Sequence, residues 1–100
     1  MNKDEKQKWK QALNDLVDRQ TQAMKDDEDD TTQAVKNSMD ENAQMVKDSE
    51  DDAAEKAKID EGVQAIKNDL DEQTQAIKDR IDKEMQERKK MIDEAIDNLP

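Results

Sequence analysis

The amino-acid sequence predicts an all-α fold in which a long helix of 11-residue (hendecad) repeats forms a coiled coil. Three observations support this prediction. Apolar residues recur at steps of three, four and four along most of the 100-residue chain, which is a helical period. No stretch alternates apolar and polar residues as a half-buried strand would. Trp9 is the single aromatic residue and 31% of the chain is hydrophobic, so a well-filled globular core is not expected.

The repeat divides residues 10–95 into units of one pattern. One unit, 54–62, has nine residues, and the full units are 10–20, 21–31, 32–42, 43–53, 63–73, 74–84 and 85–95. Position 2 is Gln and position 5 is Lys in seven of the eight units, and position 9 is Asp in all eight. The apolar residues occupy positions 1, 4 and 8. A regularity at this many positions indicates one structural unit repeated along the chain.

The apolar positions form a narrow stripe along the predicted helix. Eleven residues over three turns correspond to about 3.67 residues per turn, so positions 1, 4 and 8 span about 65° of the helix. A stripe of this width is typical of a coiled-coil seam. Because the period exceeds 3.6 residues, the sequence predicts a right-handed or nearly straight coiled coil.

The seam differs in quality between two segments that follow an N-terminal lead-in, 1–9. In segment 10–58 it has few large apolar residues and includes Glu28 and Glu50, which are costly to bury without partners. In segment 63–100 most seam residues are large and apolar. We therefore predict an oligomerisation seam in the C-terminal half, which comprises Ile59, Val63, Ile66, Leu70, Ile77, Ile81, Met85, Ile92, Ile96 and Leu99.

The nine-residue unit shifts the phase of the stripe by about half a turn. Gly62, the only glycine, lies at the end of this unit, and glycine often follows a helix C-terminus. We predict a phase break at 59–62, which is either a hinge within one long helix or the turn of a helical hairpin. A second break at Asp26–Asp30 would give a three-helix bundle, but the repeat keeps its register there, so a continuous helix is favoured.

The composition argues against enzymatic chemistry. The chain has no cysteine and no histidine, so it lacks the residues of thiol catalysis and of Cys/His zinc sites. The acidic clusters 26–30 and 48–52 lack the glycine and the glutamate of a calcium-binding loop. We predict no catalytic, cofactor-binding or metal-binding residue, and therefore no enzyme.

The charge limits the class of partner. A net charge of −11 disfavours direct nucleic-acid binding and attachment to anionic membranes. Residues 1–6 lack the apolar core of a signal peptide, and no apolar run is long enough to span a bilayer. We expect partners that are further copies of the chain or another protein, located in the cytoplasm or in a virion or surface assembly.

The recurring lysine at position 5 has two interpretations. An Asp follows it at i+4, as in Lys36–Asp40 and Lys67–Asp71, and such a pair adds a few tenths of a kcal/mol to a helix. Support of the helix and of solubility is therefore the favoured interpretation. The alternative is pairing of these lysines between chains.

The units resemble the 11-residue repeat of group 3 late embryogenesis abundant proteins. Matching residues in unit 63–73 are Val63, Gln64, Ile66, Lys67, Leu70 and Glu72, and those in unit 74–84 are Gln75, Ile77, Lys78, Arg80 and Ile81. The resemblance implies a chain that is disordered in water, becomes helical on drying and protects membranes or proteins under desiccation. The Ile-rich and Leu-rich C-terminal seam more closely resembles the hendecad coiled coils of bacterial surface stalks and phage fibres.

These features lead to one favoured function and two alternatives. We predict a non-enzymatic structural or oligomerisation element, such as a coiled-coil spacer, stalk or assembly protein. The first alternative is a desiccation or stress protectant of the kind implied by the late embryogenesis abundant repeat. The second is a compact acidic helical bundle that binds a protein partner.

Overall fold

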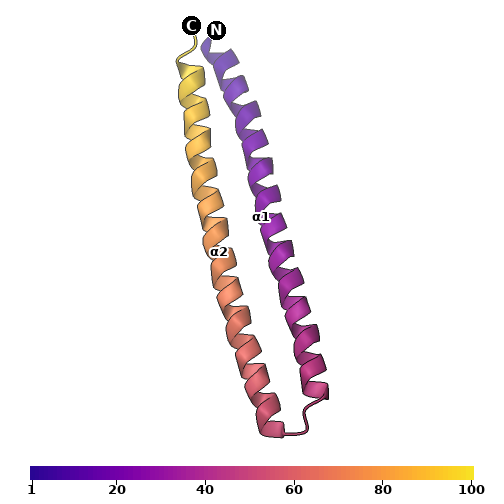
Figure 1. The fold of residues 1–100 in the computed structure, drawn as a ribbon. Helices are drawn as coiled ribbons and strands as arrows, with labels where there is room; N and C mark the ends of the chain where they lie inside the picture. The colour runs from indigo at the N-terminus through magenta and orange to yellow at the C-terminus, as the bar shows by residue number, and fades with distance from the viewer. The chain divides into compact units, whose positions relative to one another are not determined.

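A computed structural model describes all 100 residues and confirms the all-α prediction. It has two long helices, α1 (Lys3–Asp48) and α2 (Ala53–Asp97), which a short turn connects (Figure 1). The chain divides into two compact units. Unit 1 comprises 1–27 and 78–100, and unit 2 comprises 28–77, so each contains a segment of both helices.

Helix α1 begins after an N-cap residue, Asn2, whose side chain is hydrogen-bonded to Glu5. The Asn2 side-chain oxygen accepts a hydrogen bond from the Glu5 backbone N–H (2.8 Å), and the Asn2 amide donates to the Glu5 carboxylate (3.1 Å). The first of these bonds gives a partner to a backbone N–H of the first turn, which has no acceptor within the helix. From there α1 continues without a break through Asp26–Asp30, as the unbroken repeat predicted. The chain therefore has two helices and does not form the three-helix bundle.

The turn between the helices is a hairpin turn, but it lies at residues 49–52 and not at the predicted 59–62. The Ser49 hydroxyl donates to the Val46 carbonyl (3.0 Å) at the end of α1. Asp52 is the N-cap of α2, because its carboxylate accepts a hydrogen bond from the Ala54 N–H at 2.8 Å. Residues 59–62, Gly62 included, lie inside α2. Acidic and hydroxyl side chains, not glycine, therefore form the turn.

The phase shift of the repeat is absorbed in this turn. If the units of α2 are counted backwards from Val63, Ile59 and Asp60 keep positions 8 and 9, and Lys56 takes position 5. Lys56 is half-buried, whereas Lys58 remains 72% exposed. The two residues by which the nine-residue unit falls short of eleven are thus missing at 49–52. There the helix ends, so the repeat can restart in a new phase. The prediction was wrong because it placed the gap inside the nine-residue unit.

Unit 1 contains the only side chains of the chain that form a buried apolar core. Val17 of α1 and Met85 and Ile96 of α2 are the buried apolar residues of this unit, and their exposed fractions are 6%, 5% and 4%. Lys6 Nζ donates to the carbonyls of Asp97 (3.1 Å) and Leu99 (2.7 Å). A cation at the last carbonyls of α2 stabilises that helix end.

Unit 2 is a helical hairpin with a much weaker core. Its buried residues are Thr32 and Thr74, and none of its apolar side chains is buried. The two threonine hydroxyl groups hydrogen-bond to each other across the interface. Apolar interface residues between this pair and the turn, such as Met39, Val63 and Leu70, are half-buried. Two helices alone therefore cover the apolar stripe of unit 2 incompletely.

Candidate interaction surface

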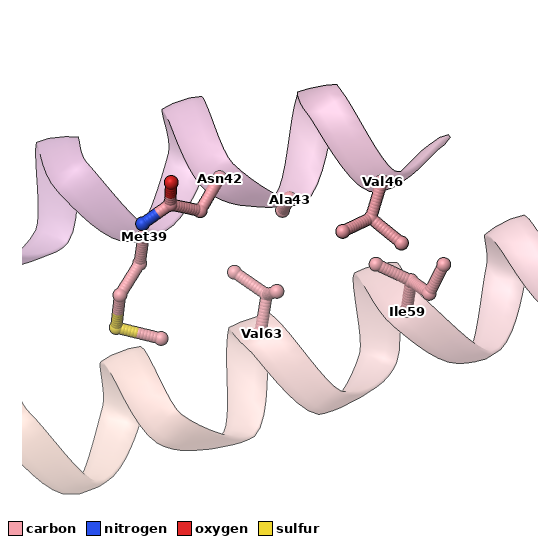
Figure 2. A pocket seen from close by; sticks show the side chains of 6 residues that line it. All are labelled: Met39, Asn42, Ala43, Val46, Ile59 and Val63. Atoms are coloured by element: carbon pink, nitrogen blue, oxygen red, sulfur yellow. The ribbon is translucent and has the colours of Figure 1, made fainter. Parts of the chain in front are cut away.

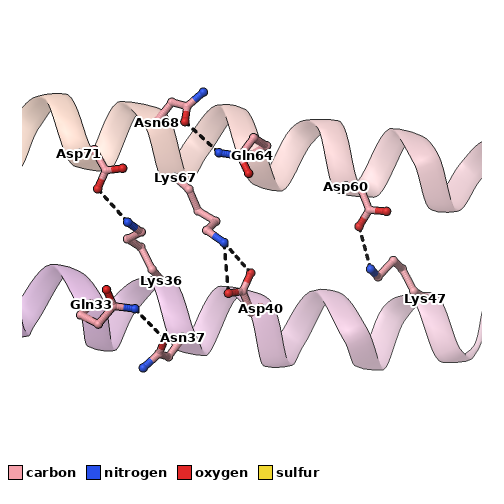
Figure 3. Close-up of polar contacts among 10 residues, drawn as sticks. All are labelled: Gln33, Lys36, Asn37, Asp40, Lys47, Asp60, Gln64, Lys67, Asn68 and Asp71. Atoms are coloured by element: carbon pink, nitrogen blue, oxygen red, sulfur yellow. Dashed lines mark hydrogen bonds and ion pairs between the residues drawn. The ribbon is translucent and has the colours of Figure 1, made fainter.

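A ladder of ion pairs joins the two helices in each unit and accounts for two constant positions of the repeat. In unit 2 the lysine at position 5 of one helix pairs with the aspartate at position 9 of the other (Figure 3). The ammonium-to-carboxylate distances are 2.9 Å for Lys36–Asp71, 3.0 Å for Lys67–Asp40 and 2.7 Å for Lys47–Asp60. From one pair to the next toward the turn, the residue number rises on α1 by as much as it falls on α2. One antiparallel register therefore satisfies all three pairs.

Unit 1 follows the same rule. Lys25 pairs with Asp82 (3.1 Å) and Lys89 pairs with Asp18 (2.9 Å). Asn14 occupies position 5 of the first unit, and its amide donates to Asp93 at position 9 (3.1 Å). The Asn14 side-chain oxygen is buried without a hydrogen-bond partner. Asn14 therefore replaces the ion pair by a neutral hydrogen bond and leaves one buried polar atom unpaired.

These contacts correct the interpretation of the position 5 lysine. Lys36 binds Asp71 on the other helix, whereas the carboxylate of Asp40, four residues after it, accepts Lys67. The lysine thus joins two helices of one chain instead of supporting its own helix. Its aliphatic stem lies in the interface, since the ladder lysines are 20–24% exposed while their aspartates are 53–62% exposed.

The glutamine at position 2 has a separate role on the outer side of the helices. Its amide donates to Asp or Asn at position 6, four residues on, which is a favourable pair along a helix. Bonds of this kind, 2.7–2.9 Å long, include Gln11–Asp15, Gln22–Asp26, Gln33–Asn37, Gln44–Asp48 and Gln64–Asn68. Figure 3 shows Gln33–Asn37 and Gln64–Asn68. The repeat therefore specifies contacts within a helix at positions 2 and 6, and contacts between helices at positions 5 and 9.

The ladder rotates the interface away from the predicted stripe. Buried and half-buried residues fall mainly at positions 1, 5 and 8, whereas the sequence predicted positions 1, 4 and 8. Position 4 lies about 65° from position 1 on one side of the helix, and position 9 lies about 65° from it on the other. Because the helices are antiparallel, the ladder occupies one side of each unit and position 4 the opposite side.

In unit 2 the side opposite the ladder is apolar and open. Val35, Val46 and Ile66 occupy position 4 there and are 42%, 53% and 52% exposed. Beside them lies a groove of about 300 Å³, lined by Met39, Asn42, Ala43, Val46, Ile59 and Val63 (Figure 2). Side chains from α1 and α2 approach each other across this groove without filling it. We call Val35, Val46, Ile66 and the groove the apolar flank of unit 2.

The predicted oligomerisation seam is mostly covered by the chain itself. Nine of its ten residues are buried or half-buried: Ile59, Val63, Leu70, Ile77, Ile81, Met85, Ile92, Ile96 and Leu99. Ile66 alone is exposed. Their role in oligomerisation stays a prediction, as does the handedness of the supercoil. The apolar side chains that remain exposed include several at position 4, and three of these, Met24, Val35 and Val46, come from the half of the sequence with the weaker seam.

The groove lining is aliphatic apart from Met39 and Asn42, and no three or more Asp and Glu side chains are grouped to hold a metal ion. Neither helix contains an apolar stretch of the length that a bilayer crossing requires. Comparisons with protein-family models, curated proteins and solved structures found no match to the chain.

Proposed function

We propose that this chain is a non-enzymatic assembly element, a helical hairpin that completes its apolar core by packing against further copies of itself. The observation that supports this proposal is the apolar flank of unit 2. Unit 2 buries no apolar side chain, while Val35, Val46 and Ile66 are each more than 40% exposed. Exposed apolar side chains that form a row beside a groove are typical of an interaction surface.

The energetics of helices favour the same proposal. Most helical stability in proteins comes from packing of an apolar face against neighbours, not from helix propensity. Fully burying a Val or Ile side chain contributes about 1.5–3 kcal/mol relative to leaving it exposed. Val35, Val46 and Ile66 are already about half-buried, so burying the rest of each side chain contributes about half of that value. Three such side chains on each of two copies would still contribute several kcal/mol, whereas an exposed ion pair of the ladder is worth about 0–1 kcal/mol. A spacer, stalk or scaffold built from stacked hairpins is the function that this geometry suits best.

Sedimentation equilibrium of the full chain between about 1 and 500 μM tests the proposal, with helicity measured on the same samples by circular dichroism. We expect a mass above that of the monomer and a helix content that rises with concentration. A monomeric mass with constant helicity over this range would contradict self-association. A chain that is largely unfolded in buffer and becomes helical only on drying would support the stress-protectant alternative.

A further inference from the structure

The two units differ strongly in charge. Unit 2 has fifteen acidic and five basic residues and a net charge of −10, whereas unit 1 has thirteen acidic and twelve basic residues and a net charge of −1. Three of the five lysines of unit 2 are engaged in its ladder. The surface around the apolar flank is therefore strongly negative, and two copies of unit 2 repel each other.

We infer that the apolar flank of unit 2 is the docking site for unit 1 of a second copy of the chain. The inference rests on the proposed function, because it names the partner surface for self-association. Facing unit 2 with a nearly neutral unit removes most of the like-charge repulsion that a unit 2 to unit 2 contact would create. Charge then adds to apolar contact in determining which surface the apolar flank binds.

Unit 1 offers a surface of the required chemistry on the corresponding side. Leu13 and Met24 occupy position 4 of α1; Leu13 is half-buried and Met24 is 41% exposed. Position 4 of the α2 unit 85–95 is Arg88, which is exposed. An arginine stem can cover apolar surface while its guanidinium group binds a carboxylate. Unit 1 thus combines apolar side chains with a cation where unit 2 has apolar side chains among acidic ones.

Gly62 provides an independent indication that a second chain approaches the apolar flank of unit 2 closely. It lies inside α2, where glycine costs about 1 kcal/mol relative to alanine, yet its φ is not positive and a Cβ added there would meet nothing within 4 Å. The fold of one chain therefore gives no reason for this glycine. Gly62 shares a helix face with Ile59 and Ile66, three and four residues away, so the missing side chain lets a second helix approach the apolar flank closely.

Intermolecular distances test the docking, because the chain has no cysteine and single spin labels can be placed at will. Val46→Cys labels the apolar flank of unit 2 and Met24→Cys labels unit 1. In mixed samples we expect the 46-to-24 distance between chains to be shorter than the 46-to-46 distance. A shorter 46-to-46 distance in a sample of dimeric mass would overturn the docking while leaving the proposed function intact.

Substitutions on the flank provide a second readout with matched controls. Ile66→Gln should weaken self-association about 10-fold or more, the loss expected from one buried Ile, and Met45→Gln, at a 70% exposed site off the flank, should change it less than 3-fold. Arg88→Glu should weaken association more than Arg80→Glu does. Gly62→Ala should raise the helicity of the monomer and still weaken association. Equal effects at flank and control sites would overturn the docking, and a monomeric wild-type chain would overturn both proposals.

Discussion

Lys36 Nζ lies 2.9 Å from the Asp71 carboxylate on the opposite helix of unit 2. Asp40, which follows Lys36 by one helical turn, is paired with Lys67 instead. The two pairs are reciprocal, because each helix supplies one lysine and one aspartate. The same arrangement explains why a lysine and an aspartate recur four residues apart in the sequence: the spacing places both on the side of the helix that faces its antiparallel neighbour.

This arrangement predicts coupling across the interface and not along the helix. A double-mutant cycle on Lys36→Met and Asp71→Asn should give a coupling energy of about 0.5 kcal/mol in urea unfolding, as for a partly exposed ion pair. The matched cycle on Lys36→Met and Asp40→Asn should give a coupling close to zero. A larger coupling for Lys36–Asp40 would show that the lysine supports its own helix in solution.

The buried hydroxyl pair predicts a non-additive effect. Thr32→Val should destabilise the chain by about 1 kcal/mol, because it leaves the Thr74 hydroxyl buried without its partner. Thr32→Val combined with Thr74→Val should recover that loss, since two apolar groups then meet at the same place. Thermal unfolding followed by circular dichroism measures both effects. Thr31→Val, at an exposed position, is the control, and additive losses in the double variant would contradict the pairing.

Asn14 predicts a stabilising substitution. Asn14→Lys places a lysine at position 5 opposite Asp93 and removes the unpartnered Asn14 oxygen. We expect a gain of about 1 kcal/mol in the free energy of unfolding, mostly from the removal of the buried unsatisfied atom. Gln86→Lys adds the same charge at an exposed position. A gain of equal size in that control would assign the effect to net charge alone.

The turn predicts a loss at one aspartate and not at its neighbour. Asp52→Ala should cost about 1 kcal/mol, because the hydrogen bond to the Ala54 N–H is lost at the N-cap of α2. Asp51→Ala removes the same charge from the same acidic segment but no capping bond, so it should be neutral or slightly stabilising. Urea unfolding compares the two variants. An equal loss in both would argue against the cap.

Periodicity alone was enough to predict the helices, their continuity at Asp26–Asp30 and the existence of a break. It could not locate the interface, because a helical wheel ranks positions by polarity, and the lysine stem at position 5 packs like an apolar group while its ammonium group reaches an aspartate. The apolar residues at position 4, such as Val35 and Val46, were therefore expected inside and lie outside. The signal that could have revealed the ladder was the constancy of Asp at position 9.

The location of the turn could not be predicted for a related reason. Gly62 is the one residue whose type suggests a helix end, whereas Ser49 and Asp52 resemble the other acidic and hydroxyl residues of the chain. The hydrogen bond from the Ala54 N–H to the Asp52 carboxylate is one that many other acidic residues of the chain could make by their type, so the sequence does not single out Asp52 as the N-cap. The decisive sequence feature was that Lys56, not Lys58, keeps the spacing of the α2 units.

Lysine–aspartate pairs that recur every eleven residues do not by themselves determine which 11-residue repeat of α1 lies opposite which repeat of α2. A shift of one helix by eleven residues would place most lysines opposite different aspartates with the same geometry. The four residues of the turn exclude that slippage, since they leave no slack for a shifted partner. The short turn thus determines the register of the two helices. A long flexible insertion at 49–52 would allow the same two helices to pair in several alternative registers.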